Sequence, residues 1–147
     1  MKITICGSIS SSAKMIETAD ELTNLGYACE LPYSTRKIKC GELILESCLK
    51  EIKTNGDKKL RREADVDVIK EHFEFIKNSD AILVVNIDKN GIKNYIGGNV
   101  LMEIGFAYVL EKKIFLLNPI PEVGYKNEII AMQPIILNSD LNKIRNF

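Results

Sequence analysis

Apolar runs separated by amphipathic segments are the main feature of this 147-residue chain. The run AILVVNI at 81–87 is apolar almost throughout, which is typical of a central parallel strand covered on both faces. Amphipathic segments such as the one with Met15, Ala19 and Leu22 have helical spacing. The predicted strands are 2–6, 27–32, 81–87, 113–118 and 134–137, and the predicted helices are 13–25, 41–56, 66–77, 99–110, 125–132 and 139–144.

The alternation of strands and helices predicts the α/β fold class. We expect a five-stranded, mostly parallel sheet with helices on both faces, in a single domain over residues 1–147. Residues 33–62 are the hardest to place. The basic cluster KKLRRE at 58–63 is expected to be a solvated helix start or loop, and the alternative is that it lies over a phosphate.

Charge and cysteine spacing narrow the possible classes of function. Twenty basic residues balance twenty acidic ones, so no overall field attracts a nucleic-acid polymer or an anionic membrane. No apolar run approaches the roughly 18 residues of a membrane span, and MKITIC has no signal-peptide pattern. The cysteines match no zinc or CxxC spacing, and Cys6 and Cys29 are expected to be buried thiols. We therefore expect a cytoplasmic protein without a metal or cofactor.

Polar residues follow three of the predicted strands. In an open parallel sheet, ligands bind beyond the carboxyl ends of the strands. The first strand is followed by GSISSS at 7–12, the third by Asn86 and Asp88, and the fourth by Asn118. We expect these loops to meet in one crevice with the start of the helix at 99–110. Asp80 lies at the opposite, amino end of its strand, where capping or a turn explains it.

The loop at 7–12 lacks the glycines of a dinucleotide-binding loop, because Ile9 and Ser12 stand where two of them would be needed. Serine hydroxyls and free helix N–H groups can still hold a single phosphate. The alternative is that the serines at 10–12 only cap the following helix.

The helix at 99–110 contains one acidic residue, Glu103, among residues that are otherwise apolar or glycine from 100 onward. This pattern predicts a helix buried all round, so the carboxylate must face a cavity, a partner or a ligand. The helix N-terminus favours the ionised form and burial opposes it. A functional role is favoured, and the alternative is a structural Glu held by loop amides.

Two glycines, Gly97 and Gly98, precede this helix. Adjacent glycines allow positive φ and a close approach of the backbone to a ligand. Asn99 is expected to cap the helix. A ligand at the helix start would then lie about one turn from Glu103.

The strings ICGSI, SDAILVVNID and GGNVLMEIGFAYVLEKKIFLL together resemble the nucleoside 2-deoxyribosyltransferase superfamily, over roughly residues 2–118. Within it, CGSI resembles the branch of 2′-deoxynucleoside 5′-phosphate N-hydrolases. The most specific part is Glu103-Ile104-Gly105-Phe106-Ala107, which matches the family pattern E-(I/L)-G-x-A.

The resemblance implies a flavodoxin- or Rossmann-like three-layer sandwich and a homodimer with sites near the subunit interface. It also implies cleavage of the base–sugar bond of a nucleoside or nucleotide, with Glu103 attacking the anomeric carbon as in retaining glycosidases. Gly7, Ser8 and Ile9 would line the sugar and phosphate pocket, and the hydroxyls of Ser10, Ser11 and Ser12 would hold a 5′-phosphate. Asp88 would contact the base or sugar.

The chain departs from the family pattern at three places. Gly97 stands where Asp or Ser usually precedes the Glu, His72 stands where the hydrolase branch has an Asp, and 33–62 has no clear counterpart. His72 is a candidate general acid or sugar contact, and the alternative is a structural histidine.

We therefore expect an N-glycosidase acting on a nucleoside 5′-monophosphate or nucleoside, by hydrolysis or by transfer of the sugar to another base. A second hypothesis is a phosphoribohydrolase of the lysine-decarboxylase-like type, which GGNVLME loosely resembles. A third is a nucleotide-binding or sensor module without turnover, supported by Gly97 and His72.

Overall fold

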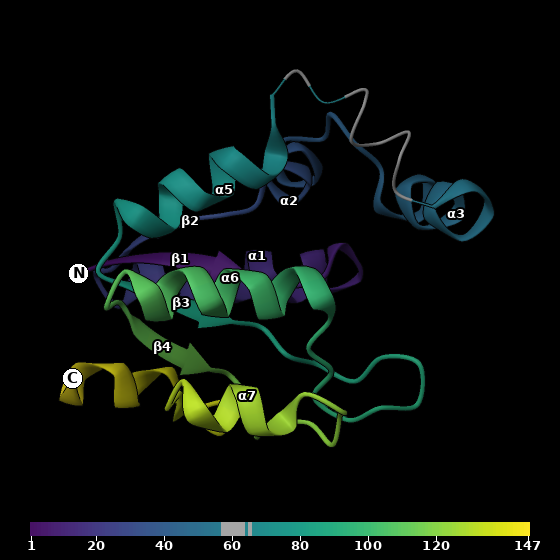
Figure 1. Ribbon diagram of the computed structural model, residues 1–147. Coiled ribbons are helices and arrows are strands. Elements are labelled where there is room, and N and C mark those ends of the chain that lie inside the picture. Colours follow the sequence, from purple (N-terminus) through teal and green to yellow (C-terminus); the bar gives the residue numbers. More distant parts are fainter. Residues whose placement is uncertain (57–63, 65) are drawn as a thin grey trace.

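The computed structural model describes residues 1–56, 64 and 66–147 (Figure 1). The basic cluster at 58–63 lies outside these described residues. The elements in chain order are β1 Lys2–Cys6, η1 Ile9–Ser11, α1 Ser12–Asn24, β2 Ala28–Glu30, α2 Tyr33–Lys39, α3 Leu45–Asn55, α5 Val68–Lys77, β3 Ala81–Val84, α6 Gly98–Val109, β4 Lys113–Leu116, α7 Lys126–Ala131, β5 Ile135–Ile136 and η2 Leu141–Asn146.

The strands form one sheet in the order β2-β1-β3-β4-β5, and every pairing is parallel. The expected α/β fold is confirmed, and the sheet is parallel throughout the described residues rather than mostly parallel. Cys6 pairs with Val84, and Val84 pairs with Leu116, so the carboxyl ends of the three central strands are level at one edge. This edge is where ligands bind in folds of this class.

Helices cover both faces of the sheet, as Figure 1 shows for α6 in front and α1 behind. Successive side chains of a strand point to opposite faces. Ile3 and Ile5 of β1 join an apolar cluster with α1 and η2, whereas Cys6 joins the cluster under α5, α6 and α7. The polar side chain of Thr4 is also buried, and its hydroxyl lies 2.7 Å from that of Ser79, directly after α5.

Several boundaries differ from the predicted ones. The segment 33–40 holds the short helix α2, whose polar sequence YSTRKIK gave no apolar pattern to identify it. The last element is a 3-10 helix, and the side chain of Asp140 accepts a hydrogen bond from the Asn142 N–H at its start. Gly26, with φ of 93°, follows the end of α1, as expected for a residue that stops a helix.

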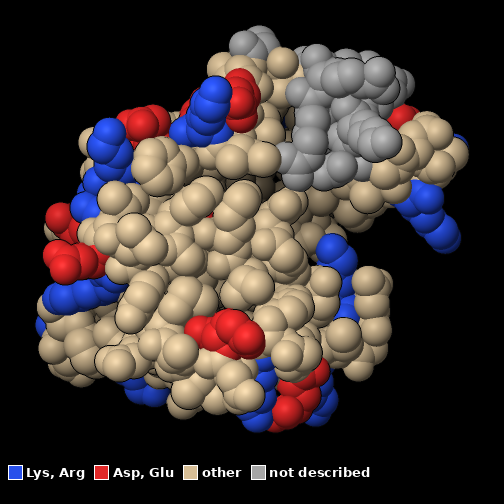
Figure 2. Space-filling model, viewed as in Figure 1, with Lys and Arg blue, Asp and Glu red and all other residues tan. Residues whose placement is uncertain are grey.

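The prediction that the helix at 99–110 is buried all round is wrong. Val100, Ile104 and Ala107 of α6 are buried, but Tyr108 is 52% exposed and Val109 is 78% exposed. The helix therefore has one buried face and one apolar face at the surface. Figure 2 shows the corresponding region of the front surface with few charged side chains. No helix in the described part of the chain is long and apolar enough to cross a membrane.

Asn86 and Asn118 do not reach the crevice expected for them. The Asn86 side-chain amide donates to the carbonyl oxygens of Asn118 and Pro119, and its oxygen accepts from the Asn118 N–H at 2.9 Å. Asn118 donates in return to the Asn86 carbonyl. These bonds join the chain segments that follow β3 and β4 and use the polar groups that were expected to bind a ligand.

Candidate active site

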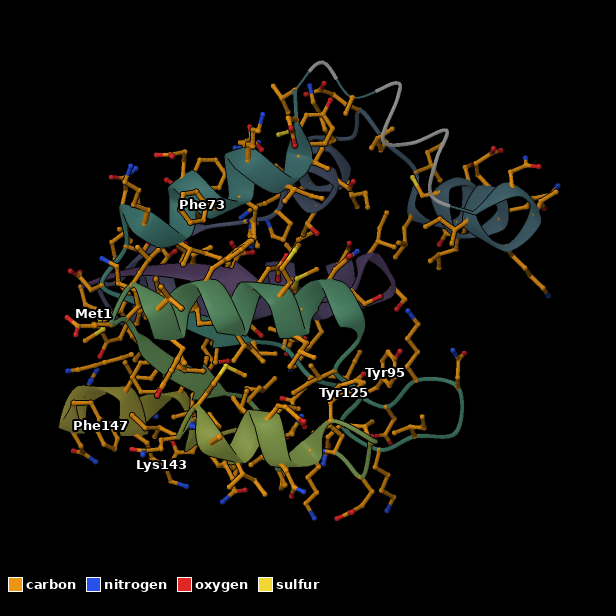
Figure 3. The ribbon with its side chains drawn as sticks, viewed as in Figure 1. Met1, Phe73, Tyr95, Tyr125, Lys143 and Phe147 are labelled. Carbon is orange, nitrogen blue, oxygen red and sulfur yellow. The ribbon has the colours of Figure 1, made fainter. Side chains whose placement is uncertain are left out.

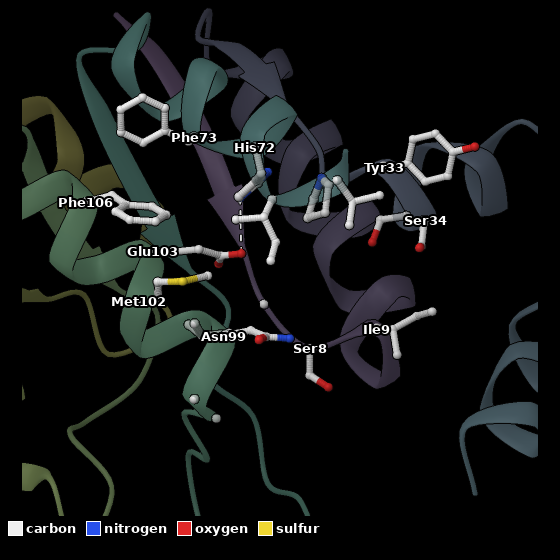
Figure 4. Close-up of a pocket in the computed structure, with 18 of the residues that line it drawn as sticks. Ser8, Ile9, Tyr33, Ser34, His72, Phe73, Asn99, Met102, Glu103 and Phe106 are labelled. Atoms are coloured by element: carbon white, nitrogen blue, oxygen red, sulfur yellow. Dashed lines mark ion pairs between the residues drawn. The ribbon is translucent and has the colours of Figure 1, made fainter. Parts of the chain in front are cut away.

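A cavity of about 510 Å³ lies beyond the carboxyl end of β1, between α2, α5 and α6 (Figure 4). This volume lies in the range of pockets that bind small molecules. Glu103 is the single acidic residue and Lys89 the single lysine or arginine of its described lining. The lining residues are Gly7, Ser8, Ile9, Pro32, Tyr33, Ser34, Thr35, Ile52, Val68, Ile69, His72, Phe73, Lys89, Tyr95, Gly97, Gly98, Asn99, Val100, Met102, Glu103 and Phe106.

Glu103 and His72 point toward one another from α6 and α5 (Figure 4). The distance from Glu103 Oε1 to His72 Nε2 is 3.7 Å. His72 Nε2 also lies 3.5 Å from Cys6 Sγ, at the last residue of β1. Three elements that are distant in sequence thus bring a thiol, an imidazole and a carboxyl group together at the inner end of the cavity.

Burial controls the protonation of this group. It raises the pKa of Glu103 to about 8, while a hydrogen bond with Cys6 acts weakly in the opposite direction. Burial and then the nearby Arg36 charge lower the pKa of His72 to about 4. The pKa of the Cys6 thiol is raised well above its usual range, chiefly by burial and secondly by Glu103. Near pH 7 all three groups are therefore predominantly neutral, and the Glu103–His72 contact is not an ion pair.

Two polar atoms of this group lack hydrogen-bond partners among the described residues. They are Glu103 Oε2 and His72 Nδ1, and both are buried. An unsatisfied buried polar atom typically costs about 1–3 kcal/mol. Such atoms are therefore uncommon in cores and are explained when a ligand or ordered water completes the site.

A second polar region of the cavity is formed by Ser8 and Lys89. Lys89 Nζ donates to Ser8 Oγ at 2.7 Å, and Ser8 Oγ lies 3.0 Å from Ser10 Oγ. Lys89 also lies over the Tyr95 ring, 5.8 Å from its centroid. A positive charge next to a hydroxyl is suited to an anionic group such as a phosphate.

Aromatic side chains form much of the remaining wall. Phe73 of α5 and Phe106 of α6 meet edge to face with their ring centroids 5.2 Å apart. Tyr33 lies across the cavity from them in Figure 4. Flat apolar surfaces of this kind are suited to a planar ring system, such as a nucleobase.

The three lining glycines have different roles. A Cβ on Gly7 would lie 2.7 Å from Sδ of the buried Met15, so a side chain there would force Met15 to shift in the core. Gly97 has φ of −87° and Gly98 does not adopt positive φ, so the predicted use of positive φ is wrong. A Cβ on Gly98 would meet nothing within 4 Å, so this backbone is open to close approach.

The prediction that Asn99 caps α6 is also wrong. Gly97 occupies the cap position, without a side-chain hydrogen bond, and Asn99 lies inside the first turn. Asn99 nevertheless lines the cavity, near Ser8 in Figure 4. Its amide is therefore available to a ligand rather than to the helix N-terminus.

Eight of the predicted site residues line the cavity and three do not. Ser10, Ser11 and Asp88 are not in the lining: Ser10 contacts Ser8, Ser11 is buried, and Asp88 accepts from the Asn94 N–H within its own loop at 2.9 Å. Ser12, also expected to face a phosphate, donates to the Ile9 carbonyl and contacts Thr35 instead. Those that line it are Gly7, Ser8, Ile9, His72, Gly97, Gly98, Asn99 and Glu103.

Sequence reasoning missed Cys6, Lys89, Tyr33 and Arg36. Cys6 looked like an ordinary buried thiol, and its nearest functional neighbour in space, His72, is 66 positions away. Lys89 lies in a predicted polar loop, where one lysine has no distinguishing pattern. Asp80 was interpreted correctly, since its side chain accepts a 2.6 Å hydrogen bond from the Lys2 N–H at the amino end of the sheet.

Comparison with known proteins gives little independent information. No family model matches the chain, and no curated protein matches it. Among solved structures, the chain is similar to a 2-deoxyribosyltransferase from Bacillus psychrosaccharolyticus, with 23% sequence identity and a TM-score of 0.49. The similarity covers 79% of this chain and 71% of that chain. It is too weak to support an activity, so the case for function depends on the site itself.

Proposed function

We propose that the protein is an N-glycosidase that cleaves the base–sugar bond of a nucleoside 5′-monophosphate or nucleoside, with Glu103 as the nucleophile. The observation that carries this proposal is Glu103 itself. Its side chain is 16% exposed, it is the single acid of the described lining, and one of its oxygens has no partner there. A carboxyl group held in this way is suited to attack on an anomeric carbon.

In the proposed reaction, the Glu103 carboxylate attacks the anomeric carbon and the base leaves with the electron pair of the C–N bond. Water then hydrolyses the resulting ester and regenerates the carboxylate, or a second base takes the sugar. Substrate hydroxyls that donate to Oε2 would favour the ionised form of Glu103. Because the pKa of Glu103 is about 8 before substrate binds, kcat/KM should increase with pH up to about that value.

The remaining lining supports a phosphorylated, base-bearing substrate. Lys89 and Ser8 are suited to a 5′-phosphate, and the walls of Phe73, Phe106 and Tyr33 are suited to a base. The Ser8–Lys89 pair takes the role first assigned to Ser10–Ser12. His72, neutral near pH 7, is proposed to contact the sugar or orient Glu103 rather than to act as a cation.

A homodimer is part of the proposal, with a second copy of the chain covering the exposed apolar face of α6. Tyr108 and Val109 at the surface support this, because such side chains are common at interfaces between protein subunits. Light scattering on the wild type and on Val109→Glu tests it. A dimer that Val109→Glu dissociates is the expected result, and a monomeric wild type would contradict this part alone.

The function is tested by chromatography of the free base released from ribo- and deoxyribonucleosides and their 5′-monophosphates, with and without a second base as acceptor. We expect release by the wild type and a loss of at least about a thousandfold in Glu103→Gln. Glu74→Gln is the matched control, because Glu74 is exposed on α5 and pairs with Lys77 outside the cavity.

Two outcomes would contradict the proposal. Base release that survives in Glu103→Gln would remove Glu103 from the chemistry. Binding of nucleotides without release from any member of the panel would favour the sensor module instead.

Lys89→Met should weaken the reaction of monophosphates more than that of nucleosides, because only the monophosphates have a phosphate that Lys89 could bind.

A further inference from the structure

Cys6, His72 and Glu103 bring three metal-ligating atoms of different kinds close together. The thiol sulfur, an imidazole nitrogen and a carboxyl oxygen all lie within 4.8 Å of one another. Cys6 is fully buried, and His72 is 5% exposed. His72 and Glu103 line the cavity and Cys6 does not, so an ion among them would be reached from the cavity, with Cys6 behind it.

We propose that these three residues bind one zinc ion, with the fourth coordination position open to the cavity. This inference concerns a ligand that the proposed glycosidase reaction does not use. It stands on the geometry of Cys6 Sγ, His72 Nε2 and the Glu103 carboxyl group.

Two of the three distances between the ligand atoms are close to the edges of a tetrahedral site. With the usual zinc–sulfur, zinc–nitrogen and zinc–oxygen bond lengths, the edges of a tetrahedron measure about 3.4–3.6 Å. The Cys6 Sγ to His72 Nε2 distance is 3.5 Å, and the His72 Nε2 to Glu103 Oε1 distance is 3.7 Å. The first needs no adjustment, and the second needs a few tenths of an ångström. Cys6 Sγ lies within 4.8 Å of a Glu103 carboxyl oxygen, so the glutamate side chain, which borders the cavity, must also move toward the sulfur by up to about 1.2 Å.

The charge of the site also suits a divalent cation. A thiolate and a carboxylate together neutralise a 2+ ion, so coordination creates a buried group with no net charge. The thiol proton of Cys6 and the carboxyl proton of Glu103 pass to solvent when the ion binds. Coordination also uses the carboxyl group whose Oε2 otherwise has no partner in the described part of the structure.

The mixture of ligands selects zinc over the common hard cations. Mg²⁺ and Ca²⁺ prefer oxygen ligands, whereas thiolate and imidazole suit zinc. Three protein ligands with an open fourth position are typical of zinc sites that bind a small molecule or water. The side chains that pack in one cluster with Cys6, such as Ile76, Val100 and Ile104, are buried and apolar, so solvent would reach the ion only from the cavity.

A zinc ion here would occupy the carboxylate that the glycosidase reaction needs. Zinc is therefore expected to inhibit base release, because a coordinated Glu103 cannot attack the sugar. Binding itself is measured without activity, so the metal site and the glycosidase can fail independently of one another.

The test is titration of the reduced, chelator-treated protein with Co²⁺, followed by Zn²⁺. We expect a thiolate-to-cobalt charge-transfer band and the intense d–d bands of four-coordinate cobalt, both removed when Zn²⁺ displaces Co²⁺. Zn²⁺ should also raise the Tm in proportion to the logarithm of its concentration, because it binds the folded protein.

Variants identify the ligands. Cys6→Ser should lose the charge-transfer band, and His72→Gln and Glu103→Gln should each weaken Co²⁺ binding by at least about tenfold. Cys48→Ser and Cys40→Ser are matched controls, because these thiols lie elsewhere, one buried and one exposed.

A wild type without the charge-transfer band at saturating Co²⁺ would overturn the proposal, as would a band unchanged in Cys6→Ser. If Cys6→Ser does not fold, the other two variants keep every thiol and still decide the question. Wild-type affinity in both would overturn it.

Discussion

The two faces of the sheet are packed in different ways. Under α1 and η2, Ile3 and Ile5 of β1 join a large apolar cluster, and the buried polar residues of α1, Ser12 and Thr18, carry only hydroxyl groups. Under α5 and α6, the neighbouring residues Thr4 and Cys6 of the same strand meet Ser79, His72 and Glu103. The second face therefore buries ionisable groups, and two of their polar atoms, Glu103 Oε2 and His72 Nδ1, lack partners among the described residues at a cost in stability. A protein retains such groups most readily where they are needed for chemistry.

The first prediction compares one phenylalanine on each face. Phe115 is fully buried in the cluster under α1, and Phe106 is partly buried beside the cavity. Phe115→Ala should lower the free energy of unfolding by about 3–5 kcal/mol. Phe106→Ala should cost clearly less, because its ring already borders open space. Urea unfolding of both variants measures the loss in unfolding free energy. Equal losses would contradict the view that the two faces of the sheet are packed differently.

The second prediction concerns the pH dependence caused by Glu103. Its folded pKa of about 8 lies above the ordinary value of 4.5, so the folded state binds more protons than the unfolded state between these values. Stability contributed by this group therefore falls as pH rises from about 4.5 to 8. Glu103→Gln removes this loss and should be more stable than wild type by roughly 3–4 kcal/mol above pH 8.

The measurement is the difference in unfolding free energy between wild type and Glu103→Gln at pH 5, 7 and 9. The difference should grow with pH. A difference that stays constant across this range would show that Glu103 has an ordinary pKa in the folded protein.

The third prediction concerns acid and His72. Burial holds its pKa at about 4, below the ordinary 6.5, so the unfolded state binds the proton more readily. Stability contributed by this group is present above about pH 6.5 and is lost as pH falls toward 4. His72→Gln should reduce the acid sensitivity by about 2–3 kcal/mol between pH 7 and 4. Acid titration followed by circular dichroism measures this, and parallel curves for the two proteins would contradict it.

The smallest effect is expected at Thr4 and Ser79, whose hydroxyls form a buried hydrogen bond of 2.7 Å. Ser79→Ala alone should cost about 1–3 kcal/mol, because the Thr4 hydroxyl loses its partner in the core. Combining it with Thr4→Val should bring the loss below about 1 kcal/mol, because both polar groups are then gone. A double variant less stable than the single one would show that these two side chains stabilise the fold by more than their mutual hydrogen bond.

The sheet and most helices could be predicted because burial leaves a clear pattern in sequence. AILVVNI indicated a central strand, and β3 pairs with strands on both sides. Helix α2 could not be predicted, because YSTRKIK has little apolar periodicity and it is held in place by contacts with distant residues. One of these is Glu71, whose two carboxylate oxygens accept from Arg36 Nη2 at 2.8 and 2.7 Å.

The candidate site was predictable only in part. Glu103 was conspicuous because it is the one acid in an apolar helix, and it does border a cavity. Cys6 and His72 lie beside it only because β1, α5 and α6 meet in space. No local sequence pattern predicts that meeting. Loop residues were the least predictable, because a side chain such as that of Asp88 or Asn118 can bind either a ligand or a backbone group of the protein. Asp88 accepts from the Asn94 N–H, and Asn118 donates to the Asn86 carbonyl.

Loop geometry also explains the error at the start of α6. Tyr95 and Tyr125 lie close together below this region in Figure 3, and the Tyr125 hydroxyl donates to the Ile96 carbonyl. A Cβ on Gly97 would lie 3.2 Å from the Tyr95 ring. The loop is thus positioned by tyrosine packing, and a side-chain cap from Asn99 was not needed.

The measurement that tests the account most directly is mass spectrometry of the protein after rapid acid quenching during base release. The account predicts a covalent sugar or sugar-phosphate adduct on the peptide that contains Glu103, absent from Glu103→Gln. Active turnover without an adduct on that peptide, together with release by Glu103→Gln, would contradict the claim that this buried carboxyl group is the nucleophile.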